Sequence, residues 1–231
     1  MKSRSISFMH WSTLARRHPS AFLLAAQLVS LVLYAALEGV PGGRILLSAF
    51  GMLVLVLVVW VVIRSPAISW IAWILAAPAV ALSLLSWLSG NPTLLLWSAL
   101  PEAALYFYGA GGLITYMMRD DRVTIDELFA AGATFTLIAW GFAFLYLVCQ
   151  AWCPGSFAGG AHPEVSWTFL ELLFFSFTNL SATGLSDILP ATATVRVLVM
   201  LEQFCGVAYI AVVVSRLIGL TIARQKGNGT P

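Results

Sequence analysis

Long and mostly uncharged runs of hydrophobic residues alternate along the chain with short polar segments rich in Pro and Gly. A helix needs about 17 to 25 mostly apolar residues to cross a bilayer. Six runs reach this length and predict transmembrane helices: Ala21 to Leu37, Ile45 to Ile63, Ala67 to Leu88, Leu94 to Met118, Phe129 to Trp152, and Val195 to Leu220. The pattern therefore predicts an all-α integral membrane protein with six transmembrane helices.

A seventh apolar stretch, Trp167 to Leu180, is too short to cross a bilayer, because it holds only 14 residues. It lies between the fifth and sixth runs and is followed by the polar segment Ser181 to Asp187. Irregular backbone at membrane depth is tolerated only where it is buried in protein or lines a water-filled path. We therefore expect a re-entrant helix and loop between the fifth and sixth helices.

Composition agrees with a membrane environment. Hydrophobic residues make up 60% of the 231-residue chain and charged residues only 10%, with a mean hydropathy of +0.92, whereas about a quarter of the residues of a soluble domain are charged. The net charge of +2 is small and indicates no nucleic-acid partner. We expect membrane lipid to be the main environment of the chain.

The positions of Lys and Arg predict the orientation, because positive charge near helix ends is retained in the cytoplasm. With the N-terminus inside, ten of the twelve fall on the cytoplasmic side, and only Arg44 and Arg196 fall outside. We therefore expect a multi-pass protein with both termini in the cytoplasm.

The start of the fifth helix carries a local signal. Thr124 is followed three residues later by Glu127, the spacing of a capping box. This pair predicts that the helix begins at the cytoplasmic surface before it enters the bilayer. A solvated charged turn is the alternative.

A motif begins within the short apolar stretch. Residues 172–190 read Leu-Leu-Phe-Phe-Ser-Phe-Thr-Asn-Leu-Ser-Ala-Thr-Gly-Leu-Ser-Asp-Ile-Leu-Pro. This segment resembles the pore helix and selectivity filter of tetrameric potassium channels, in which the filter reads Thr-Val-Gly-Tyr-Gly-Asp and Pro follows closely. The sixth run is similar to the inner helix of bacterial members, so the resemblance covers about residues 166–220.

The resemblance implies a potassium channel-like cation channel of the bacterial inner (plasma) membrane. In such a channel four loops surround an axis, and their backbone carbonyls replace the water shell of a dehydrated cation. One chain supplies one loop, so the resemblance implies a homotetramer with K+ as the permeant ion. The implied carbonyl-bearing filter residues are Ala182, Thr183, Gly184, Leu185 and Ser186, with Asp187 at the outer mouth.

The filter departs from the family pattern at three positions. Ala182 stands where the family has Thr, Leu185 where it has Tyr or Phe, and Ser186 where it has the second Gly. A left-handed conformation at Ser186 would cost about 1 to 2 kcal/mol. Two alternatives to a potassium channel follow: a non-selective channel that also passes Na+, and a non-conducting scaffold or sensor with a degenerate pore module.

Other residues are candidates for supporting this pore. Gly206 lies near the family's inner-helix hinge, although a glycine in a membrane helix is also a close-packing site. Ionisable residues inside apolar segments are candidates for function, because burying them is costly. For Glu202, snorkelling to the outer interface or pairing with Arg196 is an alternative. The remaining candidates are Phe174, Phe175, Asn179 and Glu171 in the pore helix, and Glu102 in the fourth helix.

The organisation along the chain follows from these assignments. The first four predicted helices form an N-terminal membrane domain. It lacks an Arg at every third position and does not resemble a voltage sensor. The predicted segments are this domain at 1–118, a cytoplasmic linker at 119–128, a pore domain at 129–220 and a short cytoplasmic tail at 221–231. Within the pore domain they are an outer helix at 129–152, a pore helix at 166–180, a filter at 182–187 and an inner helix at 195–220. Any ligand-sensing subunit would be a separate chain.

Enzyme chemistry is not indicated. The three histidines are terminal or in loops, and the chain has no HExxH or GxSxG motif and no cysteine-based metal spacing. We expect no catalytic residue, no cofactor and no metal beyond the permeant cation. A disulfide between Cys149 and Cys153 would be strained at helical spacing, so free thiols are the favoured interpretation.

Overall fold

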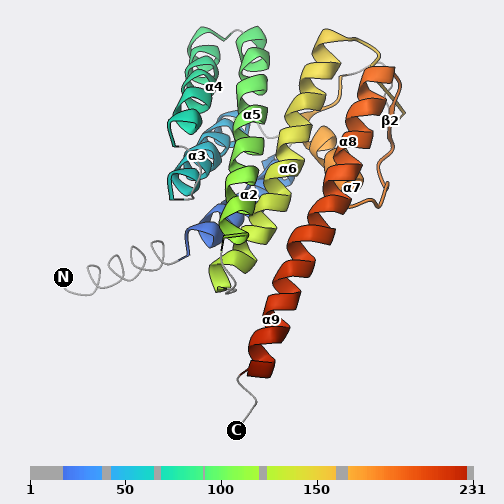
Figure 1. Cartoon of the computed structure of the whole chain (residues 1–231). Coiled ribbons are helices and arrows are strands. Elements are labelled where there is room, and N and C mark those ends of the chain that lie inside the picture. Colours follow the sequence, from blue (N-terminus) through green and yellow to red (C-terminus); the bar gives the residue numbers. More distant parts are fainter. Residues whose placement is uncertain are drawn as a thin grey trace, which may run out of the picture.

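The structure, a computed structural model, describes residues 18–37, 43–64, 69–90, 92–119, 124–159 and 166–227. Helices dominate the described residues (Figure 1). In chain order they are α2 (Pro19–Leu37), α3 (Gly43–Arg64), α4 (Ser69–Ser89), α5 (Pro92–Met117), α6 (Ile125–Trp152), α7 (Phe169–Leu180), α8 (Ala193–Tyr209), the π-helical segment η1 (Ile210–Val214) and α9 (Ser215–Gly227). The predicted linker at 120–123 and the end of the predicted tail at 228–231 lie outside the described residues.

The predicted apolar runs coincide with helices, and the sixth extends over α8, η1 and α9. Three helical segments are long and apolar enough to cross a membrane, namely Pro19–Leu37, Ile125–Trp152 and Ala193–Ile222. Shorter apolar segments occupy α3 and α4. The protein is thus a largely helical membrane protein, and a count of six spanning helices stays a prediction.

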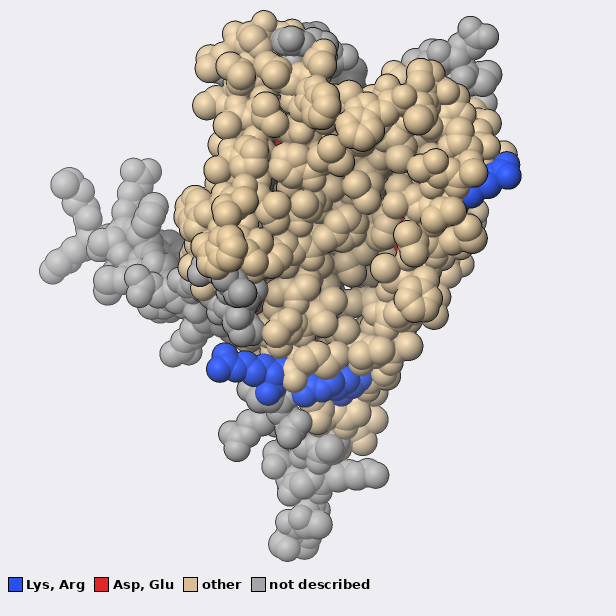
Figure 2. Space-filling view, turned by 45° about the horizontal axis from the view of Figure 1, so that its top comes forward, with Lys and Arg blue, Asp and Glu red and all other residues tan. Residues whose placement is uncertain are grey.

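Charge is almost absent from the face shown in Figure 2, where Lys and Arg gather at one end of the molecule and one more group lies near the opposite end. Among the described residues, Arg119 follows α5 and Arg216 lies in α9, whereas Arg196 lies at the start of α8. An uncharged belt between charged ends is the surface that lipid requires.

The largest differences from the predicted helix boundaries lie at the start of α6, the start of α7 and the end of α9. α6 begins at Ile125, four residues before the predicted apolar run, because Thr124 caps it: the Thr124 Oγ1 accepts the N–H of Glu127 at 3.3 Å. This confirms the start predicted from the spacing of Thr124 and Glu127. α7 begins only at Phe169, and the last helix continues to Gly227, so residues 221–227 are helical rather than an unfolded tail.

The all-α prediction is wrong between α6 and α8, where two short strands pair. β1 (Phe157–Gly159) runs antiparallel to β2 (Ile188–Pro190), with Ala158 opposite Leu189. A Cβ on Gly159, whose φ is 98°, would overlap the backbone carbonyl of Asp187. Glycine therefore lets β1 approach the segment that follows the α7–α8 loop.

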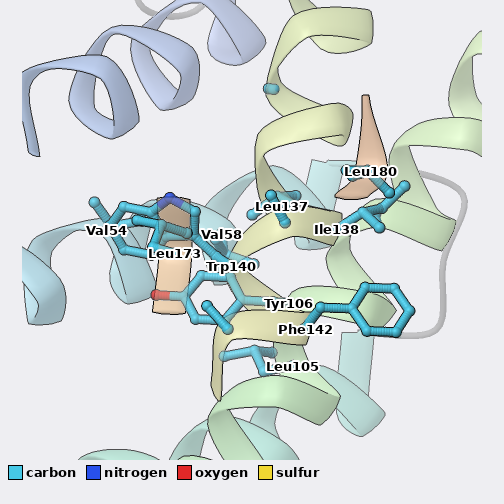
Figure 3. Close-up of a cluster of buried hydrophobic side chains, with 14 of the residues drawn as sticks. Val54, Val58, Leu105, Tyr106, Leu137, Ile138, Trp140, Phe142, Leu173 and Leu180 are labelled. Atoms are coloured by element: carbon cyan, nitrogen blue, oxygen red, sulfur yellow. The ribbon is translucent and has the colours of Figure 1, made fainter. Parts of the chain in front are cut away.

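The core lies where α6 meets its neighbours. α5 packs along α6, α4 lies on α5, α2 packs against α3 and α6, and α7 lies against both α6 and α8 (Figure 1). Figure 3 shows buried side chains from α3, α5, α6 and α7 converging around Trp140. The ring of Phe169, the first residue of α7, lies 4.7 Å from the ring of Phe144 and 5.5 Å from that of Tyr34. α7 is therefore anchored to both α2 and α6.

A polar contact ties the starts of α2 and α6 together. The Asp126 carboxylate accepts the N–H of Ser20 at 3.1 Å and its hydroxyl at 2.9 Å, and both residues are buried. The first N–H groups of a helix lack partners within it, and negative charge there is favourable. Asp126 thus caps α2 from a different helix.

We expect Asp126→Ala to lower the free energy of unfolding by about 1 to 3 kcal/mol, because it leaves two buried donors of Ser20 unpaired. The measurement is denaturant unfolding in detergent of Asp126→Ala, Ser20→Ala and the double variant. Coupling predicts that the double variant costs less than the sum of the single ones. Strictly additive losses would show that the two side chains act independently.

Candidate functional site

The N-terminal end of α7 is closed by a capping box, which fixes where this helix begins. The Thr168 N–H and hydroxyl donate to Glu171 Oε2 at 2.7 and 2.8 Å, and the Glu171 N–H donates back to Thr168 Oγ1 at 3.3 Å. Glu171 therefore supports the predicted pore helix at its first turn. It lies at the end of α7 opposite the loop.

The C-terminal end of α7 is closed by the loop that follows it. The carbonyl of Thr178 accepts the backbone N–H groups of Thr183 at 2.9 Å and Gly184 at 3.0 Å. The hydroxyl of Thr183 also donates to this carbonyl, at 3.2 Å. The last carbonyls of a helix lack partners within it. The loop supplies the missing N–H donors by folding back onto α7.

This folding back decides where the carbonyls of the loop point. In a planar trans peptide the C=O of one residue is directed opposite to the N–H of the next. Because the N–H groups of Thr183 and Gly184 face the end of α7, the carbonyls of Ala182 and Thr183 are directed away from it. Ala182, Thr183, Gly184 and Leu185 are all exposed. The loop thus presents successive carbonyls on its open side.

Backbone strain in the loop lies at Ala182 and not at Ser186. Ala182 has a φ of 57° and Gly184 a φ of 62°, and Ala182 is the only described non-glycine residue with positive φ. The expected left-handed cost at Ser186 is therefore wrong, and a cost of about 1 to 2 kcal/mol falls on Ala182 instead. Ala182 stands just after the helix cap Ser181, where a left-handed residue commonly ends a helix.

The outer part of the loop is held by local contacts. The Ser186 hydroxyl oxygen accepts the N–H of Ile188 at 3.1 Å. Asp187 is exposed at the end of the loop, and its backbone packs against Gly159. Its role at an outer mouth stays a prediction. The side chain of Leu185 is 76% exposed, so its own chain leaves most of it uncovered.

The predicted supporting residues of α7 take different positions. Phe175 is buried, with its ring 5.1 Å from that of Tyr146 and 5.8 Å from that of Phe157. Asn179 donates to the carbonyl of Phe175 at 2.9 Å and accepts from Gln203 Nε2 at 3.4 Å. The side chain of Phe174 is 51% exposed and faces outward from the chain. Phe175 and Asn179 therefore fix α7 within one chain.

Glu202 joins three helices. Its side chain is fully buried; Oε2 accepts the hydroxyl of Tyr146 in α6 at 2.6 Å, and Oε1 contacts the hydroxyl of Ser176 in α7. Arg196 instead donates from Nε to the carbonyl of Pro190 at 3.1 Å. The alternatives of snorkelling and of pairing with Arg196 are therefore wrong. Tyr146 and Ser176 could not be linked to Glu202 by local spacing, because they lie 56 and 26 positions away from it.

Glu102 is buried elsewhere, between the N-terminal helices. Its Oε1 accepts the hydroxyl of Ser83 at 2.9 Å, so it links α5 to α4. The structure does not join it to the α7–α8 loop through any described hydrogen bond. The cysteines Cys149, Cys153 and Cys205 are free thiols.

Gly206 lies where α8 crosses the end of α7. A Cβ there would overlap the backbone carbonyl of Leu180, so glycine allows the two helices to touch. The irregular turn of this helix comes later, at η1. Beyond η1, the guanidinium of Arg216 donates to the carbonyls of Met117 and Met118 at the end of α5. Gly206 thus has a packing role, and its role as a hinge stays a prediction.

We expect Gly206→Ala to destabilise the protein by about 1 to 3 kcal/mol, because the methyl group must displace backbone. Gly219→Ala is the matched control: it lies in the same long helix with nothing within 4 Å of its Cβ, and should stabilise by up to about 1 kcal/mol. Thermal unfolding in detergent measures both. Equal unfolding temperatures would contradict the packing role and leave Gly206 to a hinge.

The comparisons with known proteins bear on this geometry. A family model described as "Ion channel" matches residues 103–222, which is more than half of the chain and extends from within α5 into α9. No curated protein and no solved structure matches the chain. The matched segment contains α6, α7, the exposed loop, α8, η1 and the first part of α9. The chain belongs to this ion channel family.

Proposed function

We propose that this protein, a channel rather than an enzyme, conducts K+ through the central pore of a homotetramer. The loop from Ala182 to Ser186 is its selectivity filter. The observation that carries the proposal is the orientation of the loop: the N–H groups of Thr183 and Gly184 are held by Thr178, so the carbonyls of Ala182 and Thr183 face the open side. Carbonyl oxygens so arranged replace the hydration shell of a cation.

Electrostatics favours cations over anions in this position. The C-terminal end of a helix carries a partial negative charge, and α7 ends at Leu180, directly before the filter. Asp187 adds an exposed carboxylate at the outer end of the loop. In a tetramer four helix ends and four carboxylates would surround one axis and concentrate cations there.

The surface of the inner helix supports an assembly. α8 exposes Val197, Met200, Leu201, Phe204 and Val207. This apolar surface fits either lipid or a neighbouring copy, and a filter made of one loop per chain requires neighbours around the axis. We propose that neighbouring copies cover part of this surface while lipid covers the outer helices.

A non-selective monovalent cation channel is the second candidate. The observation that favours it is the 76% exposure of Leu185, since a leucine offers no hydroxyl to fix the outer filter. A softer outer filter would pass Na+ as well as K+.

Orientation in the bacterial inner (plasma) membrane follows the positive-inside rule. Arg119 and Arg216 lie where α5 ends and α9 begins, and this supports a cytoplasmic position for this end. The filter and β1–β2 then lie toward the outer side. A ligand-sensing subunit, where one exists, is a separate chain.

The test is cation flux out of liposomes that contain the purified tetramer, driven by an outward K+ gradient and repeated with an outward Na+ gradient. We expect wild-type flux to be lost in Gly184→Ala, because alanine disfavours a φ of 62° by about 1 to 2 kcal/mol in each of the four chains. The added methyl has room, since nothing lies within 4 Å of it in the chain. The substitution therefore changes only the backbone preference.

Gly155→Ala is the matched control, because Gly155 also has positive φ, 81°, with nothing within 4 Å of its Cβ, but lies in the turn after α6. It should leave flux unchanged. The ratio of K+ to Na+ flux decides between the two channel candidates. No flux from a verified tetramer across a range of pH and membrane potential would favour the non-conducting scaffold or sensor.

A further inference from the structure

The hydroxyl of Ser176 lies between two oxygen atoms that both need a hydrogen-bond donor. Ser176 Oγ is 2.8 Å from the carbonyl oxygen of Ala139 and is also in hydrogen-bond contact with Glu202 Oε1. A hydroxyl has one proton, and both a carbonyl and an ionised carboxylate only accept. With an ionised Glu202, the single proton of Ser176 could serve only one of the two contacts. The other contact would bring two oxygen atoms together without a proton between them.

A second proton, on Glu202, satisfies every atom of this cluster. Glu202 Oε1–H then donates to Ser176 Oγ, the Ser176 hydroxyl donates to the Ala139 carbonyl, and Tyr146 donates to Glu202 Oε2 at 2.6 Å. Protonated carboxyl groups act as donor and acceptor at once. We propose that Glu202 is a neutral carboxylic acid that acts as the positioning residue of α7 and, through α7, of the filter.

The cluster is placed to control the filter, an inference that rests on the proposed function. Ser176 lies two residues before Thr178. The carbonyl of Thr178 accepts the N–H groups of Thr183 and Gly184. Ala139 and Tyr146 belong to α6 and Glu202 to α8, so the chain of hydrogen bonds fixes α7 between its two neighbours. A shift of α7 would move the atom to which the filter is bound.

Burial makes this arrangement demanding. Ser176 and Glu202 are fully buried, as is Tyr146. In such surroundings an unpaired polar group is costly, whereas a complete network is rigid. Next to Glu202, Gln203 reaches Asn179, and Gly206 touches the end of α7 at Leu180. Glu202, Gln203 and Gly206 of α8 therefore together define the position of the same end of α7.

Glu202→Gln tests the neutral acid directly. Its amide N–H can donate to Ser176 and its carbonyl can accept from Tyr146, so the whole chain of hydrogen bonds is retained without an ionisable group. We expect K+ flux, the K+ to Na+ ratio and the unfolding temperature of Glu202→Gln to stay close to wild type. We expect Glu202→Ala and Ser176→Ala to lower the ratio by roughly tenfold, the effect of one unpaired buried group.

A matched pair of variants, one of them a control, separates positioning from general damage. Tyr146→Phe removes the donor to Glu202, whereas Tyr209→Phe removes a hydroxyl that donates to the Ala131 carbonyl of the same helix α6 at 2.6 Å, outside the cluster. We expect Tyr146→Phe alone to lower the K+ to Na+ ratio. Equal ratios in the two variants would overturn the positioning role.

Infrared spectroscopy of the solubilised protein tests the protonation state without any flux. We expect a carboxylic acid C=O band that Glu202→Gln removes; Glu102→Gln identifies the contribution of Glu102, another buried acid. A wild-type spectrum without this band, or Glu202→Gln behaving like Glu202→Ala, would overturn the neutral acid. A third outcome separates the two proposals. If the band is present and Glu202→Gln unfolds at the same temperature as wild type, Glu202 is a neutral acid. If the wild type then conducts no cation, only the proposed function fails.

Discussion

The pore-forming half of the chain depends on how the two polar ends of α7 are satisfied. This helix has 12 residues, too few to reach water on both sides of a bilayer, so its unpaired N–H and C=O groups need partners from protein. Thr168 and Glu171 close its N-terminal end, and the N–H groups of Thr183 and Gly184 close its C-terminal end. The shape of the loop is the consequence of the second requirement: once its N–H groups are used by α7, its carbonyls remain for a ligand.

α6 is the element against which this arrangement is built. Its glycines allow close approach, since Gly141 packs on the ring of Phe107 and Gly132 on Leu24. It supplies the Ala139 carbonyl and the Tyr146 hydroxyl to the Glu202 cluster, and Asp126 to the start of α2. The segment from α7 to α8 and the N-terminal helices therefore pack against the same helix, α6. A family match that begins in α5 agrees with this continuity.

Features that follow from local spacing could be read from the sequence. The apolar runs, the short helix, the Thr124 cap and the glycine at 184 depend on residues close together in the chain. The Glu202 cluster and the β1–β2 pair depend on residues far apart, and strands of three residues leave no periodicity to detect. The position of the left-handed residue was missed because the end of α7, rather than the family pattern, decides it.

The structure changes the significance of the three filter departures. Ala182 takes the left-handed position that ends α7, and Ser186 uses its hydroxyl to bind the N–H of Ile188, so both substitutions have a local structural role. Leu185 has an exposed side chain that neither strain nor a hydrogen bond explains. Within the proposed filter, the segment from Ala182 to Gly184 is bound to α7, whereas the side chain of Leu185 is left exposed by its own chain. In the proposed channel, any relaxation of selectivity should therefore originate at Leu185, beyond the last hydrogen bond to α7.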